Sequence, residues 1–272
     1  MLRWARVVFI VSVLAFTAHA LAQVQSSESA TSKNQLIREE ERVIVNGVPE
    51  LWRLQWKALP KPVCDANALW MAITCPCQGF AYGEAGQLDL VRLKNESEID
   101  RLELTPLFER LFFKGNVATV QRWEPREKDF TNLEAVGFES QVHSRPVVKI
   151  MNVADYNHDG QATEFFLQTG VKPCGKVMGI VVGVTKRDPR LHVFGTVLNP
   201  NKPLVLQRME WVALLTAAHP GEILDWPCGD HGSESEVDLD ITASNGEIQG
   251  IRREYACTEA GIRGKLLSEQ PF

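Results

Sequence analysis

Much of the chain alternates hydrophobic and polar residues with the two-residue period of β-strands. In residues 51–56, Trp52, Leu54 and Trp56 fall on one face, and residues 237–242 alternate in the same way. Residues 88–93 also predict a strand. The run 176–184 is apolar at nearly every position, which predicts a strand that is buried on both faces.

Two Asn-Gly pairs predict tight hairpin turns between such strands. Asn46-Gly47 follows a short run at 42–45, and Asn245-Gly246 precedes a returning run at 248–255. Because a two-residue turn joins antiparallel neighbours, we expect a mainly β fold. Its antiparallel sheet would form a sandwich or an incomplete propeller-like arrangement with one or two helices.

Helical spacing occurs in two places. Thr105 and Pro106 fit the start of a helix with its body at 107–113 and a stop at Gly115. A second helix is expected over about 203–218. Its apolar positions, which favour a stripe facing the core over a ligand site, are Leu204, Met209, Trp211, Val212 and Leu215.

The N-terminal residues predict export. A basic start, an apolar run and small-residue cleavage patterns favour a signal peptide over residues 1–22. Residues 23–41 are polar and predict a flexible segment, which leaves 42–272 as a single β-rich domain. The mature protein is therefore expected in the periplasm or outside the cell, with no stable membrane span.

The charge balance bears on possible partners. The formal net charge is −5, and removal of 1–22 takes away Arg3 and Arg6 and shifts it to −7. No dense basic run is present, so nucleic acid is not expected as a partner. An envelope or extracellular protein or a glycan is compatible with this composition, and the sequence does not indicate an oligomeric state.

The cysteine count favours disulfides. Six cysteines follow the signal, and an oxidising compartment predicts up to three disulfides, with Cys64 paired to Cys75 or Cys77 as the preferred short loop. A redox pair at Cys75 and Cys77, or a zinc site with Cys228 and His231, is the sharper alternative. Neither fits the usual two-residue cysteine spacing.

The most informative segment is the acidic stretch at 155–164. Oxygen side chains alternate along its first half, and Gly160 permits a sharp turn that brings later oxygens back toward them. A calcium ion requires six to eight such oxygens. The candidate ligands are the side chains of Asp155, Asn157 and Asp159, the carbonyl of Gln161 and the carboxylate of Glu164.

The flanking residues exclude an EF-hand. Residues 147–154 and 165–169 both predict strands, whereas an EF-hand requires two helices, and its twelfth loop position is Phe166 here.

The stretch 153–160, with its apolar continuation, instead resembles an FG-GAP or VCBS-type repeat, in which a calcium loop joins two β-strands. The resemblance covers 147–170, occurs once, and implies a bound Ca²⁺. The last acidic ligand of that family falls at Thr163, whereas this chain places Glu164 one residue later. Glu164, Thr163 or a water molecule could therefore complete the site.

A metal-free acidic turn is the simpler alternative, because Asp and Asn also bond to their own backbone. Three carboxylates in one loop favour the ion, since two such charges about 4 Å apart repel by roughly 4 kcal/mol at an effective dielectric constant near 20.

Catalytic signatures are sparse. The sequence lacks nucleophile-elbow, phosphate-loop, zinc-protease and dinucleotide-binding motifs. Asp230 and His231, beside Trp226, form the cluster most compatible with acid–base chemistry. The alternative function is therefore a secreted hydrolase that uses these two residues, with Glu164 as a candidate third. The favoured interpretation is a non-enzymatic binding or structural module, stabilised by calcium and disulfides.

Overall fold

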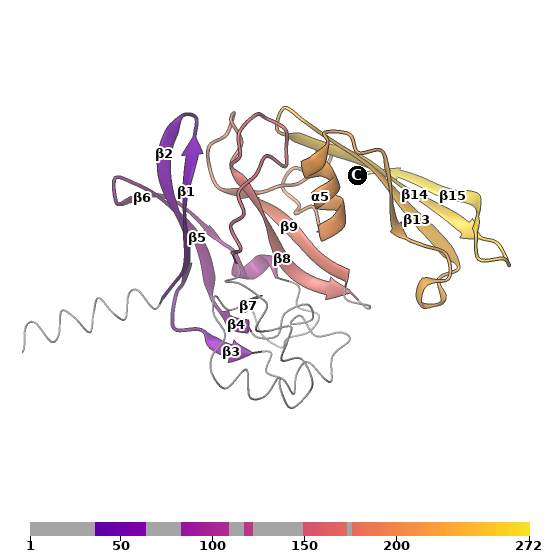
Figure 1. The fold of residues 1–272 in the computed structure, drawn as a ribbon, viewed down its shortest axis with the longest axis horizontal. Helices are drawn as coiled ribbons and strands as arrows, with labels where there is room; N and C mark the ends of the chain where they lie inside the picture. Colours follow the sequence, from indigo (N-terminus) through magenta and orange to yellow (C-terminus); the bar gives the residue numbers. More distant parts are fainter. Residues whose placement is uncertain (1–35, 64–82, 109–116, 122–148, 173–175) are drawn as a thin grey trace, which may run out of the picture.

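The protein folds into four antiparallel sheets. The computed structural model describes residues 36–63, 83–108, 117–121, 149–172 and 176–272 (Figure 1). The first sheet has the order β1 (Ile37–Val45), β2 (Val48–Trp56), β5 (Leu88–Lys94) and β6 (Ser97–Glu103). A small sheet has the order β3 (Lys61–Val63), β4 (Gly83–Gly86) and β7 (Ala118–Gln121).

The other two sheets lie toward the C-terminus. In the central sheet, β9 (Lys176–Gly183) pairs with β8 (Glu164–Lys172), β10 (His192–Val193) and β11 (Leu206–Gln207). The fourth sheet has the order β12 (Glu222–Trp226), β13 (Ser235–Ser244), β14 (Glu247–Cys257) and β15 (Arg263–Pro271). The described helical segments are η1 (Thr105–Leu107), α5 (Arg208–Thr216) and η3 (Asp230–Gly232). The prediction of a mainly β, antiparallel fold is confirmed.

The central sheet separates two hydrophobic cores. Figure 1 shows β8 and β9 between the first sheet on one side and α5 with the fourth sheet on the other. Ile180 and Val182 belong to the core shared with the first sheet, whereas Val181 belongs to the core shared with α5 and β13. Alternate residues of a strand point to opposite faces, so β9 must be apolar on both. The prediction for 176–184 is confirmed.

Local patterns also placed the hairpins correctly. Asn46 and Gly47 join β1 to β2 with φ angles of 51° and 79°, and Asn245 and Gly246 join β13 to β14 with 52° and 90°. Positive φ at both positions is the conformation for which Asn-Gly is selected. The three alternate residues of 51–56 are at most 2% exposed, as predicted.

Three expectations from the sequence are wrong in detail. Residues 37–41, assigned to a flexible segment, form the start of β1. The helix expected at 105–113 begins in the described residues as a single 3-10 turn at 105–107 and stops at Phe108, which is extended; Thr105 bonds to the Leu88 backbone, and 109–113 lie outside the described residues. Residues 149–153 form no strand; Ala154 makes one isolated bridge to Glu164.

Helix α5 is shorter than the expected 203–218, and its apolar stripe is narrower. Trp211 is fully buried and donates its indole N–H to the Gly179 carbonyl on β9 at 3.1 Å. Met209 and Val212, expected to face the core, are 58% and 49% exposed. The core prediction therefore holds for Trp211 but is wrong for these two.

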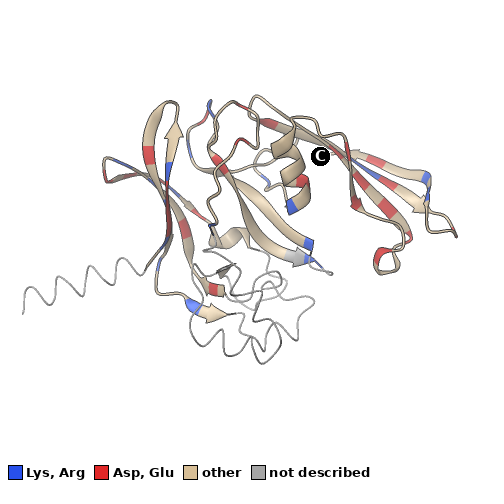
Figure 2. Cartoon of the chain, in the orientation of Figure 1, with Lys and Arg blue, Asp and Glu red and all other residues tan. Residues whose placement is uncertain are grey.

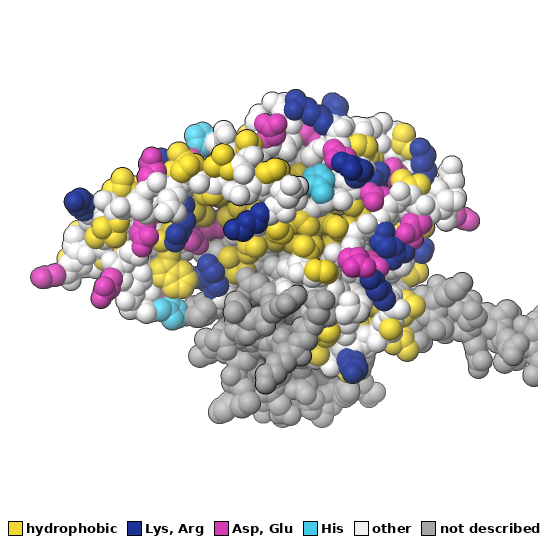
Figure 3. Space-filling view, turned by 180° about the vertical axis from the view of Figure 1, so that it is seen from behind, with side chains coloured by type: hydrophobic (Ala, Val, Ile, Leu, Met, Phe, Trp, Pro, Cys, Tyr) yellow, Lys and Arg dark blue, Asp and Glu magenta, His cyan; other side chains and the backbone are white. Residues whose placement is uncertain are grey.

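Surface charge and apolar side chains are unevenly distributed. Acidic residues follow the fourth sheet in Figure 2, where Arg263 pairs with Glu222, Glu236 and Asp238. The face in Figure 3 has a central band of hydrophobic side chains with basic side chains among them. Within the described ranges, no helix has the length and apolar character to cross a bilayer.

Candidate metal centre

The acidic loop is closed at its base by backbone pairing. Ala154 and Glu164 exchange two backbone hydrogen bonds of 2.7 and 3.1 Å, and β8 begins at Glu164. Gly160 has a φ of +87°, which L-residues with a side chain rarely adopt, so glycine provides the predicted turn. The loop thus begins and ends at one point on the edge of the central sheet.

Oxygens in the first half of the loop turn inward onto its own backbone. Asp155 accepts hydrogen bonds from the N–H groups of Asp159 at 3.1 Å and Gly160 at 3.0 Å. Asn157 accepts from the Asp159 N–H at 2.9 Å, and Asp159 accepts from the Gln161 N–H at 2.9 Å. These bonds are those of an acidic turn, and they hold the three side chains on the inner side of the loop.

The loop is also attached to the β1–β2 turn. The Gln161 side chain accepts from the Asn46 N–H at 2.6 Å and donates to the Asn46 side chain at 3.0 Å. The second Asp159 oxygen accepts from the Lys186 N–H at 2.6 Å, and Asn46 reaches the Lys186 carbonyl at 3.4 Å. Gln161 therefore uses its side chain for tertiary contact, which leaves its carbonyl to the loop.

The opposite side of the loop holds the β13–β14 turn. The carbonyls of His158 and Asn157 accept from the N–H groups of Asn245 at 3.2 Å and Gly246 at 3.1 Å. The His158 ring nitrogen lies 2.6 Å from the Leu214 carbonyl in α5. One loop thus connects the first sheet, the central sheet, the fourth sheet and the helix.

Glu164 lies beneath the loop and is fully buried. Its carboxylate accepts from the Tyr156 N–H at 2.9 Å and contacts the Thr163 hydroxyl at 2.7 Å. Burial, together with the negative charges of Asp159 and Asp155, raises the pKa of Glu164 to about 8. Three carboxyl groups therefore influence one another in a small volume.

No basic side chain in the described ranges forms an ion pair with Asp155, Asp159 or Glu164. Among the same residues, no group of three or more His, Cys, Asp or Glu side chains has the arrangement of a metal site. An ion held here would therefore also need the amide oxygen of Asn157 and the carbonyl of Gln161, as the sequence predicts. The Thr163 hydroxyl is engaged with Glu164 and the Val184 carbonyl.

Comparisons with known proteins do not assign a family. No protein-family model, curated protein or solved structure matches this chain.

The structure places the other candidate residues in a paired cluster near the surface. Asp230 bonds to Lys176 at 2.5 Å and to His231 at 2.7 Å, and these hydrogen bonds lower the pKa of Asp230. The Lys176 ammonium also lies 3.4 Å from the centre of the Trp226 ring. Three cavities are lined by described residues, one beside Arg208, one beside Phe272 and one beside His192. Neither Asp230 nor His231 lines any of these three.

One disulfide is present in the described part of the chain, between Cys228 and Cys257. It closes a separation of 29 residues and joins the loop after β12 to the end of β14. On the chain-entropy account, such a link contributes about 3 to 4 kcal/mol to stability. The preferred pairing of Cys64 with Cys75 or Cys77, the redox alternative at that pair, and the signal peptide all lie outside the described residues.

Sequence reasoning missed the partners that hold the loop. Asn46 and Asn245 were recognised as turn residues, but nothing in the local pattern indicates that both turns contact 157–161. It also missed Arg208, whose neighbours Phe166 and Gln168 come from a distant strand. Next to Arg208 on α5, the apolar residues Met209 and Val212 are exposed, although the sequence pattern predicted that they face the core.

Proposed function

We propose that the mature protein is an exported, non-enzymatic binding or structural module whose acidic loop holds a structural Ca²⁺. The observation that carries this proposal is the position of the loop. The charges of Asp155 and Asp159 act on the buried Glu164, no basic side chain in the described residues pairs with any of the three, and the same loop bonds both hairpin turns. A divalent cation would relieve this repulsion at the junction of three sheets.

The role is assigned as structural because the ligands lie at a packing junction. The resemblance to FG-GAP or VCBS-type loops supports the same assignment. Asp155, Asn157, Asp159, the Gln161 carbonyl and Glu164 would hold the ion. The alternative of a hydrolase at Asp230 and His231 gains no support from the described cavities, so we retain the binding module.

The test is thermal unfolding of the mature protein with excess calcium and with a calcium chelator. At a calcium concentration 100-fold above the dissociation constant, binding adds about 2.7 kcal/mol, which for a chain of this size corresponds to a shift in Tm of about 5 to 10 °C. Asp159→Ala is expected to lower Tm in calcium and to remove the effect of the chelator.

Glu98→Gln on β6 is the matched control, because it removes one negative charge outside the loop. It should keep the full chelator response. Equal melting of the parent protein in calcium and in chelator would overturn the structural calcium assignment, as would an Asp159→Ala variant that still responds.

A further inference from the structure

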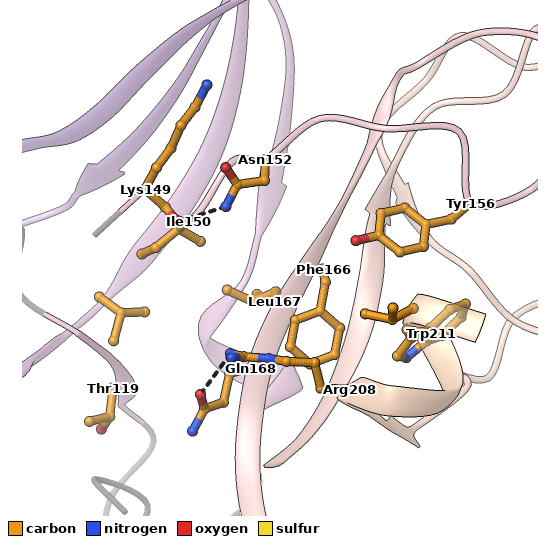
Figure 4. Close-up of a pocket in the computed structure, with 12 residues that line it drawn as sticks. Thr119, Lys149, Ile150, Asn152, Tyr156, Phe166, Leu167, Gln168, Arg208 and Trp211 are labelled. Carbon is orange, nitrogen blue, oxygen red and sulfur yellow. Dashed lines mark hydrogen bonds between the residues drawn. The ribbon is translucent and has the colours of Figure 1, made fainter. Parts of the chain in front are cut away.

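A cavity of about 320 Å³ is lined in part by Tyr156, a residue of the acidic loop (Figure 4). It is formed where β8, β7, the start of α5 and the segment 149–152 meet. Its volume is at the lower end of the range found for small-molecule sites.

The walls on one side are aromatic and aliphatic. Tyr156 and Trp211 meet edge to face with their centroids 6.1 Å apart, and Phe166 lies beside them on β8. Val212, which is 49% exposed, closes this side at the solvent. Figure 4 shows the Tyr156 hydroxyl turned toward the cavity. Such walls fit a flat apolar group.

Arg208 supplies a positive charge against these walls. Its guanidinium carbon lies 5.3 Å from the centre of the Phe166 ring, and within the described residues its polar contact is a long hydrogen bond of 3.4 Å to the Gln168 oxygen. Among the residues that the structure describes, no carboxylate pairs with Arg208. The apolar surroundings lower the pKa of Arg208, because they remove part of its hydration.

The second basic residue of the cavity is already neutralised. Lys149 pairs with Glu41 at 2.6 Å, and Figure 4 shows its amino group pointing away from the cavity. The site therefore offers one net positive charge, which matches a ligand with one negative charge.

Two further polar atoms at the cavity lack partners. The Nε2 of Gln168 and the hydroxyl of Thr119 are buried and make no hydrogen bond within the described structure, and Thr119 as a whole is only 6% exposed. Because each of these atoms has almost no accessible surface, neither opens into the cavity, and the polar contact for a ligand is left to Arg208.

We propose that this cavity binds a small organic monocarboxylate with a flat apolar body. Its carboxylate pairs with the fork of Arg208, while its body packs against Phe166 and Trp211. Guanidinium is the side chain that best matches a carboxylate in two-point contact. The cavity shares Tyr156 with the acidic loop, but none of the five proposed calcium ligands lines it.

The test is calorimetric titration of the mature protein in calcium with 3-phenylpropionate and with its neutral analogue 3-phenylpropanamide. The acid is expected to bind at least tenfold more tightly than the amide. Arg208→Gln should weaken binding of the acid roughly ten- to a hundredfold and abolish the difference between the two probes.

Arg187→Gln is the matched control, because Arg187 is 74% exposed and lies outside the cavity. It should bind both probes as the parent protein does. Arg208→Lys separates a forked contact from a point charge and should retain only part of the preference for the acid. Val212→Trp should reduce binding of both probes by filling the apolar side.

Circular dichroism confirms that each variant is folded before titration. The proposal is overturned if the parent protein binds neither probe, if it binds acid and amide equally, or if folded Arg208→Gln keeps the preference for the acid. It fails as well if Arg187→Gln weakens the acid as much as Arg208→Gln does, since that outcome reflects net charge alone. None of these outcomes bears on the calcium response of Tm.

Discussion

Single buried carboxylates organise this fold to a degree that composition does not reveal. Glu39 is 5% exposed and accepts from the N–H groups of Ile150 at 2.8 Å and Met151 at 2.9 Å. These two bonds offset part of the cost of burial, which still raises the pKa of Glu39, and they anchor the segment that leads into the acidic loop. The polar composition of 23–41 predicted a flexible segment because burying a charged side chain is costly. A carboxylate that accepts hydrogen bonds, as Glu39 does, can nevertheless be buried.

Glu210 is a second buried carboxylate, at the start of α5. It accepts from the Gln207 N–H at 2.7 Å in a capping box, and its other oxygen has no partner in the described structure. Burial and the charge of Asp225 raise the pKa of Glu210 to about 8, while Lys172 opposes this shift. The helix N-terminus is thus held by a group that prefers its protonated form.

This pKa has a consequence for stability against pH. Between the ordinary value of 4.5 and about 8, the folded state binds a proton that the unfolded state does not. The free energy of unfolding therefore falls as pH rises through this window, by at most about 1.4 kcal/mol per pH unit. Glu210→Gln should reduce that slope and raise stability at pH 8, because its amide oxygen can still accept from Gln207.

Urea unfolding at pH 5, 6.5 and 8 measures the slope. The series is run in chelator, where Glu164 holds no ion and contributes in the same direction, so the variant lowers the slope without abolishing it. Glu98→Gln serves as the control, since Arg101 lowers the pKa of Glu98 and its titration lies below the window. Identical slopes for the parent protein and Glu210→Gln would contradict the assignment.

At the scale of elements, the sequence predicts what depends on neighbouring residues. Both Asn-Gly hairpins and the two-faced strand β9 follow from local turn chemistry and from strand periodicity. In the described part of the strand expected at 147–154, residues 149–153 form no strand, because Glu39 binds the N–H groups of Ile150 and Met151 that a neighbouring strand would require. Whether this segment forms a strand depends on a contact with Glu39, which lies more than 100 residues away, so the local sequence pattern cannot predict it.

The β1–β2 turn depends both on the local backbone conformation and on contacts with distant residues. Two substitutions of Asn46 test these contributions separately. Asn46→Gly keeps the positive φ and loses only side-chain bonds to Gln161 and Lys186, so we expect a cost of about 1 kcal/mol. Asn46→Val also forces a β-branched residue to a φ of 51°, which adds about 1 to 3 kcal/mol.

Chemical denaturation of the two variants in calcium provides the measurement. Equal losses of stability would show that turn conformation does not matter here. A neutral Asn46→Gly would show that the Asn46 side-chain bonds to Gln161 and Lys186 contribute nothing, because glycine keeps the backbone N–H bond to Gln161.

For the whole molecule, the unpredicted feature is that one loop joins sheets from distant parts of the chain. The sequence indicates the ligand set at 155–164 because alternating oxygens and a glycine are a local pattern. The bonds from this loop to Asn46 and to Asn245 span the length of the chain and follow only from the packing of three layers. The cavity at Arg208 is likewise a product of this packing.

This arrangement predicts where calcium should act on the dynamics of the folded protein. The amides of Asn46, Asn245 and Gly246 donate to the loop, whereas Val181 lies in the core of β9. Removing calcium would loosen the loop and free these three amides together, although they belong to two sheets. Amide hydrogen exchange followed by mass spectrometry should therefore show faster exchange, by about tenfold or more, in both turn peptides. Peptides from β9 should keep their protection, because local opening leaves the two cores packed.

Asp159→Ala in calcium should reproduce the same pattern, and Glu98→Gln should not. Acceleration confined to one turn would contradict the role of the loop as a shared junction, and uniform acceleration including β9 would place the effect of calcium on global unfolding instead.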